Sequence, residues 1–519
     1  MPDTSDGGGR LVLVTGASGY IGGRLVPELL RAGYRVRAGA RTVGGLRDHP
    51  WYGDVEPVRA DVLDAEQLRA ALDGVDVAYY LVHAIGGGGD FEETDRRAAR
   101  VFGAAAREAG VRRIVYLGGL LPKDEKLSRH LRSRAEVGEI LMASGVPTIV
   151  LQAAVIIGSG GASFEMLRYL TERLPVMVTP TWVDTRIQPI AIRDVLYYLV
   201  AVAGIREELN RSFDIGGPDV LTYRDMMQRY ARVSGLPRRR IVRVPVLTPR
   251  LSSHWVGLVT PVPAGIAKPL VESLRNTVVC DEHDIAAHVP DPAGGLTGLD
   301  RALELALTRV RDHDVATHWS NAEVPGTPSD PMPTDPAWAG GSLYVDDRSC
   351  VVDASPEALW RVIVGIGGQN GWYSWPLAWR VRGLLDRLSG GPGLRRGRRS
   401  PTALYTGDAV DWWRVEEIDE GRLLRLRAEM RLPGLAWLDL SVEQDDRGRT
   451  VFRQRALFHP RGLVGQAYWW SVAPFHDVVF GGMQRNIARA AEAAEVDGRP
   501  VDVAAPTGAP ASRDRPAAR

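Results

Sequence analysis

The chain has 519 residues, is 45% hydrophobic and 24% charged, and carries a formal net charge of +1. Such a length predicts two or three globular domains, and a charge near zero argues against a general nucleic-acid-binding protein. Its two cysteines stand far apart without metal-ligand spacing, so we expect no disulfide scaffold, no metal site and a cytoplasmic location. We also expect no signal peptide and no membrane span, because the N-terminus is polar and no apolar run reaches roughly 18 residues.

The chain is organised around residues 11–22, LVLVTGASGYIG. An apolar run closed by glycines at every third position predicts a buried parallel strand that turns sharply into a helix. Glycine suits this turn because a side chain would keep a phosphate away from the backbone N–H groups, and the helix start adds its positive dipole end. The alternative is an ordinary glycine-rich turn. The predicted phosphate-binding residues are Gly16, Ala17, Ser18, Gly19, Tyr20, Ile21 and Gly22.

Strand-like and helix-like stretches alternate after this turn. Strands are predicted over residues 34–40, 55–60, 75–82, 114–117 and 148–157, and helices over 65–72, 91–109 and 131–144. This alternation predicts an α/β domain over residues 10–157, a doubly wound parallel sheet of the NAD(P)-binding Rossmann type with right-handed crossovers. Ligands of such sheets bind at the carboxyl ends of the strands. The pattern loosens over residues 158–319, which we assign to a substrate lobe.

Three strand ends supply the other predicted cofactor contacts. Arg41 ends the second strand, where an acidic residue binds the ribose of NAD and an arginine suits the 2′-phosphate of NADP. We therefore expect NADP, as NADPH, rather than NAD; a solvated surface arginine is the alternative. Asp61 and Val62 follow the third strand, where Asp61 meets an adenine amine or caps the next helix. Leu81 and His83 end the fourth strand and face the same cleft, although His83 could be a structural histidine.

Short motifs in the first part of the chain resemble a known family. They are TGASGYIG at Thr15, ADVLD at Ala60, YYLVHAIG at Tyr79, YLGGL at Tyr116, QPIAIRDV at Gln188 and FDIGGPDVLTYRDMM at Phe213. In these motifs the chain resembles the atypical, NmrA-like short-chain dehydrogenase/reductases. The resemblance implies a Rossmann fold with bound NADP(H), and it does not by itself imply catalysis.

The family's reductases use a tyrosine and a lysine four positions apart on one helix, and no Tyr-x-x-x-Lys occurs in this chain. The fifth strand also ends in Gly118 and Gly119 instead of the usual catalytic serine. His130 and Arg134 are four apart on the corresponding helix and share a face. We predict them as the catalytic residues, since an imidazole works as acid or base near neutrality and a guanidinium fixes ribose or phosphate. The alternative is that both only hydrogen-bond at a cofactor site. Asp95, on the preceding helix, could equally belong to a solvated face.

The remainder of the chain predicts a separate domain. Residues 320–341 are rich in Pro, Gly and Ser and predict a linker, and residues 496–519 predict a disordered tail. Between them, residues 342–495 predict an α+β domain with a helix from Pro356, a last helix from about Asp477, and strands over 409–418, 423–430, 437–443 and 450–458. This order resembles the helix-grip fold of polyketide cyclases and START domains. Motifs such as DAVDWWRVEEID resemble more closely a domain of unknown function that trails atypical short-chain dehydrogenases.

Tryptophan is concentrated in this last domain, at Trp372, Trp375, Trp379, Trp412, Trp413, Trp437, Trp469 and Trp470. Core packing explains most of them, and a cavity for a small apolar partner is the alternative. Residues 394–399, LRRGRR, are a solvated loop or a site for an anionic partner. For the whole chain we favour an NADP-dependent oxidoreductase that acts on an apolar carbonyl or quinone-like substrate. The alternatives are a non-catalytic NADP(H) sensor or scaffold and a lipophilic-ligand-binding protein.

Overall fold

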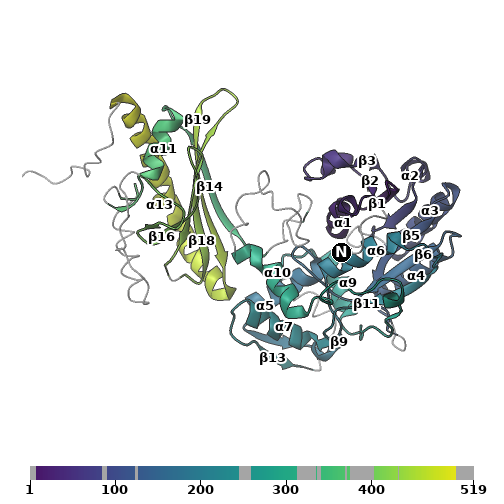
Figure 1. Cartoon of the computed structure of the whole chain (residues 1–519). Helices are drawn as coiled ribbons and strands as arrows, with labels where there is room; N and C mark the ends of the chain where they lie inside the picture. The colour runs from purple at the N-terminus through teal and green to yellow at the C-terminus, as the bar shows by residue number, and fades with distance from the viewer. Residues whose placement is uncertain are drawn as a thin grey trace, which may run out of the picture. The chain divides into compact units, whose positions relative to one another are not determined.

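A computed structural model describes residues 8–84, 91–122, 127–244, 259–311, 335, 341–368, 371–373, 403–430 and 432–497. Two compact units divide the chain into Met1–Ser342 and Leu343–Arg519 (Figure 1). Most of the expected linker, the stretch 394–399 and almost all of the expected tail lie outside the described residues, as do Trp375 and Trp379. No helix of the described part is long and apolar enough to cross a membrane.

The N-terminal unit is built on a seven-stranded sheet with the order β11-β6-β5-β4-β1-β2-β3, in which all neighbours run parallel. Its strands are β1 (Leu11–Thr15), β2 (Arg35–Ala40), β3 (Glu56–Arg59), β4 (Val77–Tyr80), β5 (Arg113–Gly119), β6 (Thr148–Ala153) and β11 (Arg211–Ile215). The strand order reverses between β1 and β4, which is the position where ligands bind to such sheets. The predicted parallel sheet of the Rossmann type is confirmed.

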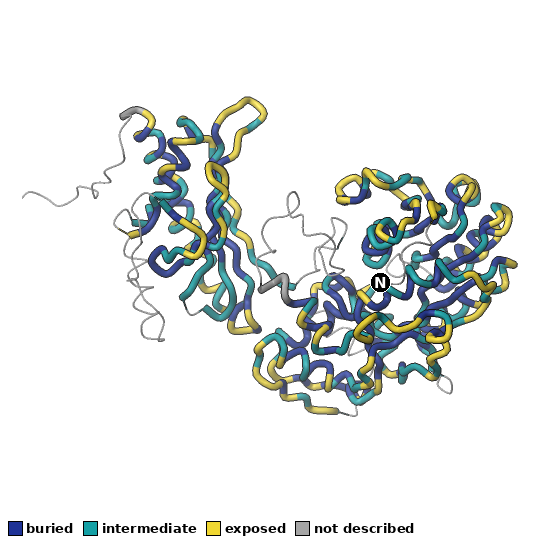
Figure 2. The backbone as a smooth tube through the Cα atoms, viewed as in Figure 1, coloured by how far each residue is buried: buried dark blue, intermediate teal, exposed yellow. Residues whose placement is uncertain are grey.

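Helices cover both faces of this sheet (Figure 1). One face carries α1 (Tyr20–Arg31) and α6 (Ile192–Gly204); the other carries α2 (Ala65–Leu72), α3 (Phe91–Glu108) and α4 (Arg129–Met142). Val12 and Val14 of β1 pack in the same core as Leu199 of α6. Leu13, between them, packs in the opposite core with Phe102 of α3. Because both faces are covered, β1 and β4 are buried along their whole length, as Figure 2 shows.

Two strands of this unit differ from the prediction. The expected strand over 148–157 ends at Ala153, and Ile156–Ile157 (β7) pairs instead with Ile190–Ala191 (β10), outside the main sheet. The seventh strand, β11, comes from the stretch that we expected to form only a substrate lobe. It is an edge strand in which only Phe213 and Ile215 are buried, so its sequence lacks the continuous apolar run of a central strand.

The rest of the unit forms a helical lobe with its own apolar core. Its elements are α5 (Ala162–Arg173), α7 (Tyr223–Val233), α9 (Ala264–Ser273) and α10 (Leu299–Arg311), with short pairs of β8 (Val176–Thr179) and β13 (Arg240–Arg243), and of β9 (Arg186–Ile187) and β12 (Leu221–Thr222). This lobe borders the carboxyl ends of β5 and β6, and its assignment as a substrate lobe stays a prediction.

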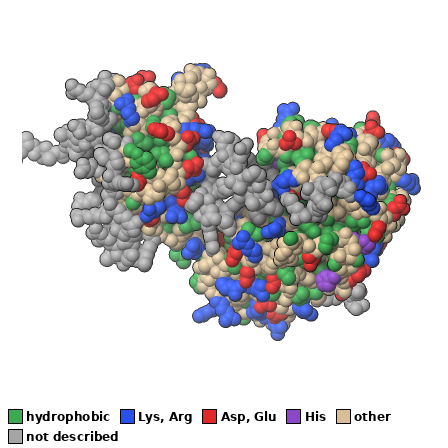
Figure 3. All heavy atoms as spheres, in the orientation of Figure 1, with side chains coloured by type: hydrophobic (Ala, Val, Ile, Leu, Met, Phe, Trp, Pro, Cys, Tyr) green, Lys and Arg blue, Asp and Glu red, His purple; other side chains and the backbone are tan. Residues whose placement is uncertain are grey.

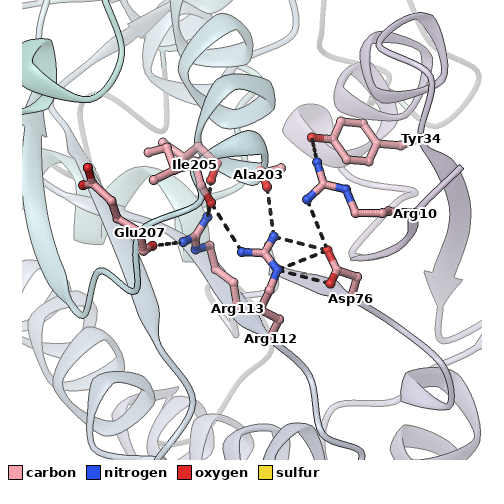
Figure 4. A network of polar contacts seen from close by, with 9 residues as sticks. Arg10, Tyr34, Asp76, Arg112, Arg113, Ala203, Ile205 and Glu207 are labelled. Atoms are coloured by element: carbon pink, nitrogen blue, oxygen red, sulfur yellow. Dashed lines mark hydrogen bonds and ion pairs between the residues drawn. The ribbon is translucent and has the colours of Figure 1, made fainter. Parts of the chain in front are cut away.

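Arginines fix the amino-terminal edge of the sheet, opposite to the edge where ligands bind (Figure 4). Arg113, at the start of β5, is fully buried and donates to the carbonyls of Ile205 at 2.6 Å and of Glu207. Burial lowers the pKa of Arg113 to about 10, so the guanidinium stays charged at neutral pH. Next to it, Arg112 pairs with Asp76 at 3.1 Å. These contacts attach the end of α6 to the sheet. Because they lie at the amino edge, they do not occupy the carboxyl edge, where ligands of such sheets bind.

The C-terminal unit is a six-stranded antiparallel sheet with the order β14-β19-β18-β17-β16-β15, packed against α11 (Pro356–Val364) and α13 (Gly462–Asp497). Its strands are β14 (Tyr344–Val351), β15 (Ala409–Val410), β16 (Trp413–Asp419), β17 (Leu423–Ala428), β18 (Gly434–Gln444) and β19 (Thr450–Pro460). The expected strand over 409–418 is interrupted at Asp411, which has a φ of 55°. The prediction that the last helix starts near Asp477 is wrong: α13 starts at Gly462 and continues through Pro474, a residue that normally interrupts a helix.

We expect the variant Asp439→Asn to destabilise the C-terminal unit by about 3 kcal/mol or more, because it leaves a buried guanidinium without its main partner. Asp439 accepts two hydrogen bonds from Arg425, at 2.9 and 3.2 Å, and both side chains are almost completely buried. The exposed pair of Asp347 and Arg453 provides the control, since Asp347→Asn should cost less than about 1 kcal/mol. Calorimetry of the full chain measures both changes, and equal effects would contradict the prediction.

Candidate functional site

Gly16 in the turn between β1 and α1, and Gly22 in the first part of α1, have no room for side chains. Gly16 has a φ of 72°, and a Cβ atom there would lie 2.8 Å from the carbonyl oxygen of Leu81, at the end of β4. A Cβ atom on Gly22 would lie only 2.2 Å from the carbonyl oxygen of Gly16. Thr15 also joins β1 to β4, because its hydroxyl donates to the carbonyl of Tyr79 at 2.7 Å. The glycines therefore allow the strand ends and the helix start to approach one another closely.

The first turn of α1 keeps its backbone donors free of side-chain caps. Gly19 is the N-cap and supplies no side chain, and the first turn contains no acidic residue. The N–H groups and the dipole of this helix start suit an anion such as a diphosphate. Two of the predicted contacts already use their N–H groups within the chain: Ala17 donates to the carbonyl of Gly39 at 3.1 Å and Gly19 to that of Gly16 at 2.8 Å.

Tyr20 lies in the predicted turn but its ring packs against the segment that follows β7. A Cβ atom on Gly158 would lie 2.3 Å from the Tyr20 hydroxyl, which is buried without a hydrogen-bond partner among the described residues. The guanidinium of Arg24 lies 4.2 Å from the centre of the ring and makes a bidentate ion pair with Asp335, at 2.6 and 2.9 Å. One residue of the expected linker is thus anchored beside the turn.

The ends of β2 and β3 place the predicted ribose and adenine contacts. Arg41 follows β2 and is exposed. Asp61 does not cap α2: its Oδ1 accepts the N–H of Leu63 at 3.0 Å, whereas Asp64 is the N-cap and accepts from Glu66 and Gln67. The alternative in which Asp61 caps α2 is therefore wrong. Val62 is half-buried beside it.

His83 lies after β4 and is held by Asp95 of α3. Its Nδ1 lies 3.4 Å from Asp95 Oδ2. The same carboxylate oxygen accepts the hydroxyl of Ser133 at 3.0 Å, and Asp95 Oδ1 accepts the N–H of Ala84 at 2.9 Å. Burial disfavours the charged carboxylate, but these hydrogen bonds outweigh it and lower the pKa of Asp95 below its usual value. Asp95 is therefore an ionised, buried hydrogen-bond acceptor.

His130 and Arg134 lie close to His83 on the first turns of α4. The ring centres of His83 and His130 are 5.4 Å apart, and Arg134 donates to the carbonyl of Leu117 at 3.4 Å. Burial and the charge of Arg134 lower the pKa of His83 to about 4, although Asp95 acts in the opposite direction. Burial, Arg134 and His83 lower the pKa of His130 well below its usual value. Both imidazoles are thus neutral at pH 7.

An apolar cavity of about 120 Å³ reaches this group of residues. Gly119, at the end of β5, and His130 line it together with apolar side chains of the helical lobe. These include Met166, Leu167, Met226, Met227, Leu270 and Val271. The sequence predicted neither this cavity nor its position, because its walls come from three helices that are far apart in the chain.

Asp95 is 4% exposed, so the alternative that it belongs to a solvated face is wrong. A signal was present in the sequence. Ala98, Ala99 and Phe102 follow Asp95 at the spacing of one helix face, and all of them are buried. A carboxylate on the apolar face of a helix indicates a specific partner, because an unpaired buried charge is costly.

Parts of both units match known proteins. Residues 16–156 match a family described as NAD(P)H-binding, and residues 338–483 match one described as a protein of unknown function (DUF2867). A 3β-hydroxysteroid dehydrogenase/Δ5→4-isomerase of Mycobacterium tuberculosis is 36% identical over 115 residues, which is 20% of this chain and only 30% of that protein's length. A ceramide reductase of Caulobacter vibrioides is 28% identical over 313 residues, or 57% of this chain and 93% of that protein.

Among solved structures, the triphenylmethane reductase of Citrobacter sp. in complex with NADP(H) is similar with a TM-score of 0.46 and 20% identity, over 57% of this chain and 99% of that one. From the two family matches, the protein carries an NAD(P)H-binding domain of the Rossmann type and a DUF2867 domain.

Proposed function

We propose that the protein is an NADP(H)-dependent oxidoreductase that acts on an apolar carbonyl or quinone-like substrate. One observation carries this proposal: the apolar cavity ends at His130, beside the carboxyl edge of the sheet where the glycine turn lies. A substrate in this cavity has a hydrocarbon body among leucine and methionine side chains and its polar end at the imidazoles. A cleft with apolar walls and few polar groups is the usual form of a small-molecule site.

The cofactor fits the residues of the carboxyl edge. The uncapped N–H groups of α1 suit the diphosphate, Arg41 the 2′-phosphate, and Asp61 the adenine amine. The preference for NADP over NAD rests on Arg41. The bound nicotinamide supplies hydride transfer.

His130 and Arg134 stand where the family's reductases carry tyrosine and lysine. A neutral imidazole donates a hydrogen bond to a carbonyl oxygen and thereby polarises it. Arg134, anchored on the carbonyl of Leu117, supplies a fixed positive charge for ribose or phosphate. Burial, together with the same charge, keeps both histidines neutral.

The C-terminal unit supports a more specific fold assignment, the helix-grip type. Its antiparallel sheet packs against the long helix α13, as in that fold. Two of its tryptophans act in packing: Trp372 stacks on Trp412 with ring centres 5.1 Å apart and donates to Asp411 at 2.7 Å. A ligand-binding role for this unit has no comparable support.

NADPH binding followed by turnover tests the proposal. The purified chain should bind NADPH, measured by calorimetry, and should oxidise it when apolar aldehydes or quinones are added. Gly22→Ala should abolish binding, because its Cβ would overlap the carbonyl of Gly16, whereas Gly53→Ala meets nothing within 4 Å and is the control. Binding without turnover of any compound would favour the sensor function instead.

We expect Arg41→Ala to weaken NADPH about ten- to hundredfold and to leave NADH almost unchanged, since a hydrogen bond to a charged group contributes roughly 1.5–3 kcal/mol. Calorimetric titration with both nucleotides measures the two constants. Arg35→Ala, at the opposite end of β2 beside Glu56, is the matched control. Equal losses for NADPH and NADH would contradict the assignment of NADP.

Filling the cavity should reduce the reaction with bulky substrates. We expect Met227→Trp to lower kcat/KM for a long apolar aldehyde by about tenfold or more while NADPH affinity is unchanged. Val178→Trp, at an exposed position of β8, is the control. Steady-state kinetics with long and short aldehydes compare the variants, and an unchanged ratio of the two would place the substrate elsewhere.

A further inference from the structure

We propose that Asp95 and His83 form the acid–base pair of this enzyme, with His83 Nε2 as the atom that exchanges a proton with the substrate oxygen. The inference rests on the proposed oxidoreductase function and assigns the reacting group within it. It gives Asp95 the role of a positioning residue, because it acts through His83. The pair takes the place of the Tyr–Lys dyad that the chain lacks.

The hydrogen bonds around Asp95 determine which nitrogen of His83 carries the proton. Asp95 is ionised and can only accept hydrogen bonds. His83 Nδ1, 3.4 Å from Asp95 Oδ2, must therefore be the protonated nitrogen of the neutral ring. The remaining nitrogen, Nε2, carries a lone pair and is an acceptor. It is buried and has no hydrogen-bond partner among the described residues.

An unpartnered buried nitrogen at this position indicates a ligand. Burying a polar atom without a hydrogen bond is unfavourable, and a substrate hydroxyl that donates to Nε2 would remove this cost. The ring of His130 lies 5.4 Å away, and its Nδ1 is also buried without a partner in the described part of the chain. His130 lines the apolar cavity and the ring of His83 is its neighbour, so the proposal puts the polar end of a bound molecule at this pair of rings.

The atom Nε2 selects the substrate class. The lone pair of Nε2 accepts a hydrogen bond from an O–H group and cannot donate one to a carbonyl. The resting state of the site therefore favours an apolar alcohol. In the oxidation of that alcohol by NADP⁺, the O–H proton moves to His83 Nε2 and the C–H bond yields hydride to the nicotinamide, so that a C=O bond forms. The imidazolium is stabilised by Asp95 and loses its proton to water. Carbonyl reduction is the reverse, with His83 protonated first.

The charged and titratable groups near His83 set its response to pH. Burial opposes a charge on His83 and Arg134 acts in the same direction, whereas Asp95 favours the imidazolium; His130, the neighbouring ring, is itself kept neutral by burial, Arg134 and His83. Since the pKa of His83 is about 4, the ring stays neutral from pH 8 down to about 5 and protonates below that. The value of kcat/KM for alcohol oxidation should accordingly fall only as the pH approaches 4.

The experiment compares Asp95→Asn with Glu136→Gln in the full chain. The second variant also converts a carboxylate to an amide, on α4, where Glu136 pairs with Arg96 at 2.9 Å. With NADP⁺ and n-decanol or cyclohexanol, Asp95→Asn should lower kcat by about 10²–10⁴-fold, because the amide can no longer hold the proton on Nδ1. NADP⁺ affinity should be unchanged, and Glu136→Gln should match the parent. Equal rates for all three proteins would overturn the inference and leave the oxidoreductase function standing.

A second readout does not depend on turnover. NMR of isotope-labelled imidazole nitrogens should show His83 as the Nδ1–H tautomer in the parent, a change of tautomer in Asp95→Asn, and a shift of Nε2 when n-decanol is added. If the parent binds NADPH but oxidises no alcohol, these signals separate the two claims. The Nδ1–H tautomer with a shifted Nε2 supports the pair as the binding group, and the Nε2–H tautomer overturns it.

Discussion

The close approach of three backbone segments at the carboxyl edge is the constraint on which the rest depends. Gly16 faces the carbonyl of Leu81, and Gly22 faces the carbonyl of Gly16, at distances that exclude any Cβ atom. Because these segments touch through backbone alone, the start of α1 stays close to the ends of β1 and β4. The same approach brings the segment after β4, with His83, next to the cofactor site.

Charge is distributed differently at the two edges of the sheet. At the amino edge, Arg112 and Arg113 donate hydrogen bonds to backbone carbonyl groups, and Arg112 also pairs with Asp76 (Figure 4). Both arginines therefore have a structural role. At the carboxyl edge, Arg134 donates to the carbonyl of Leu117 and its charge lowers the pKa of two nearby imidazoles. On the visible face of the N-terminal unit the other acidic and basic side chains are interspersed, as Figure 3 shows. The charges that act on the candidate site are therefore those of individual nearby side chains, and the net charge of +1 does not indicate them.

Neutral imidazoles change what chemistry the site can perform. A tyrosine–lysine dyad delivers a proton to a carbonyl from an acid that is protonated at neutral pH. Here the buried Asp95 fixes a ring whose free nitrogen accepts instead. The two arrangements use different elements, since the dyad lies on one helix whereas His83 follows β4 and Asp95 lies on α3. The absence of the dyad is thus compatible with catalysis.

The sequence by itself determined the parallel sheet, the glycine turn and the bounds of α2 and α3, because these follow from local periodicity and from residues a few positions apart. The site roles of Arg41, His83 and His130 stay predictions; the first two residues follow β2 and β4, and His130 lies in the first turn of α4. Only the tertiary structure decided that Asp95 holds His83, that α5, α7 and α9 enclose a cavity at His130, and that β11 completes the sheet. These are contacts between segments distant in the chain, and a local pattern carries no information about which distant side chain will fill the remaining space.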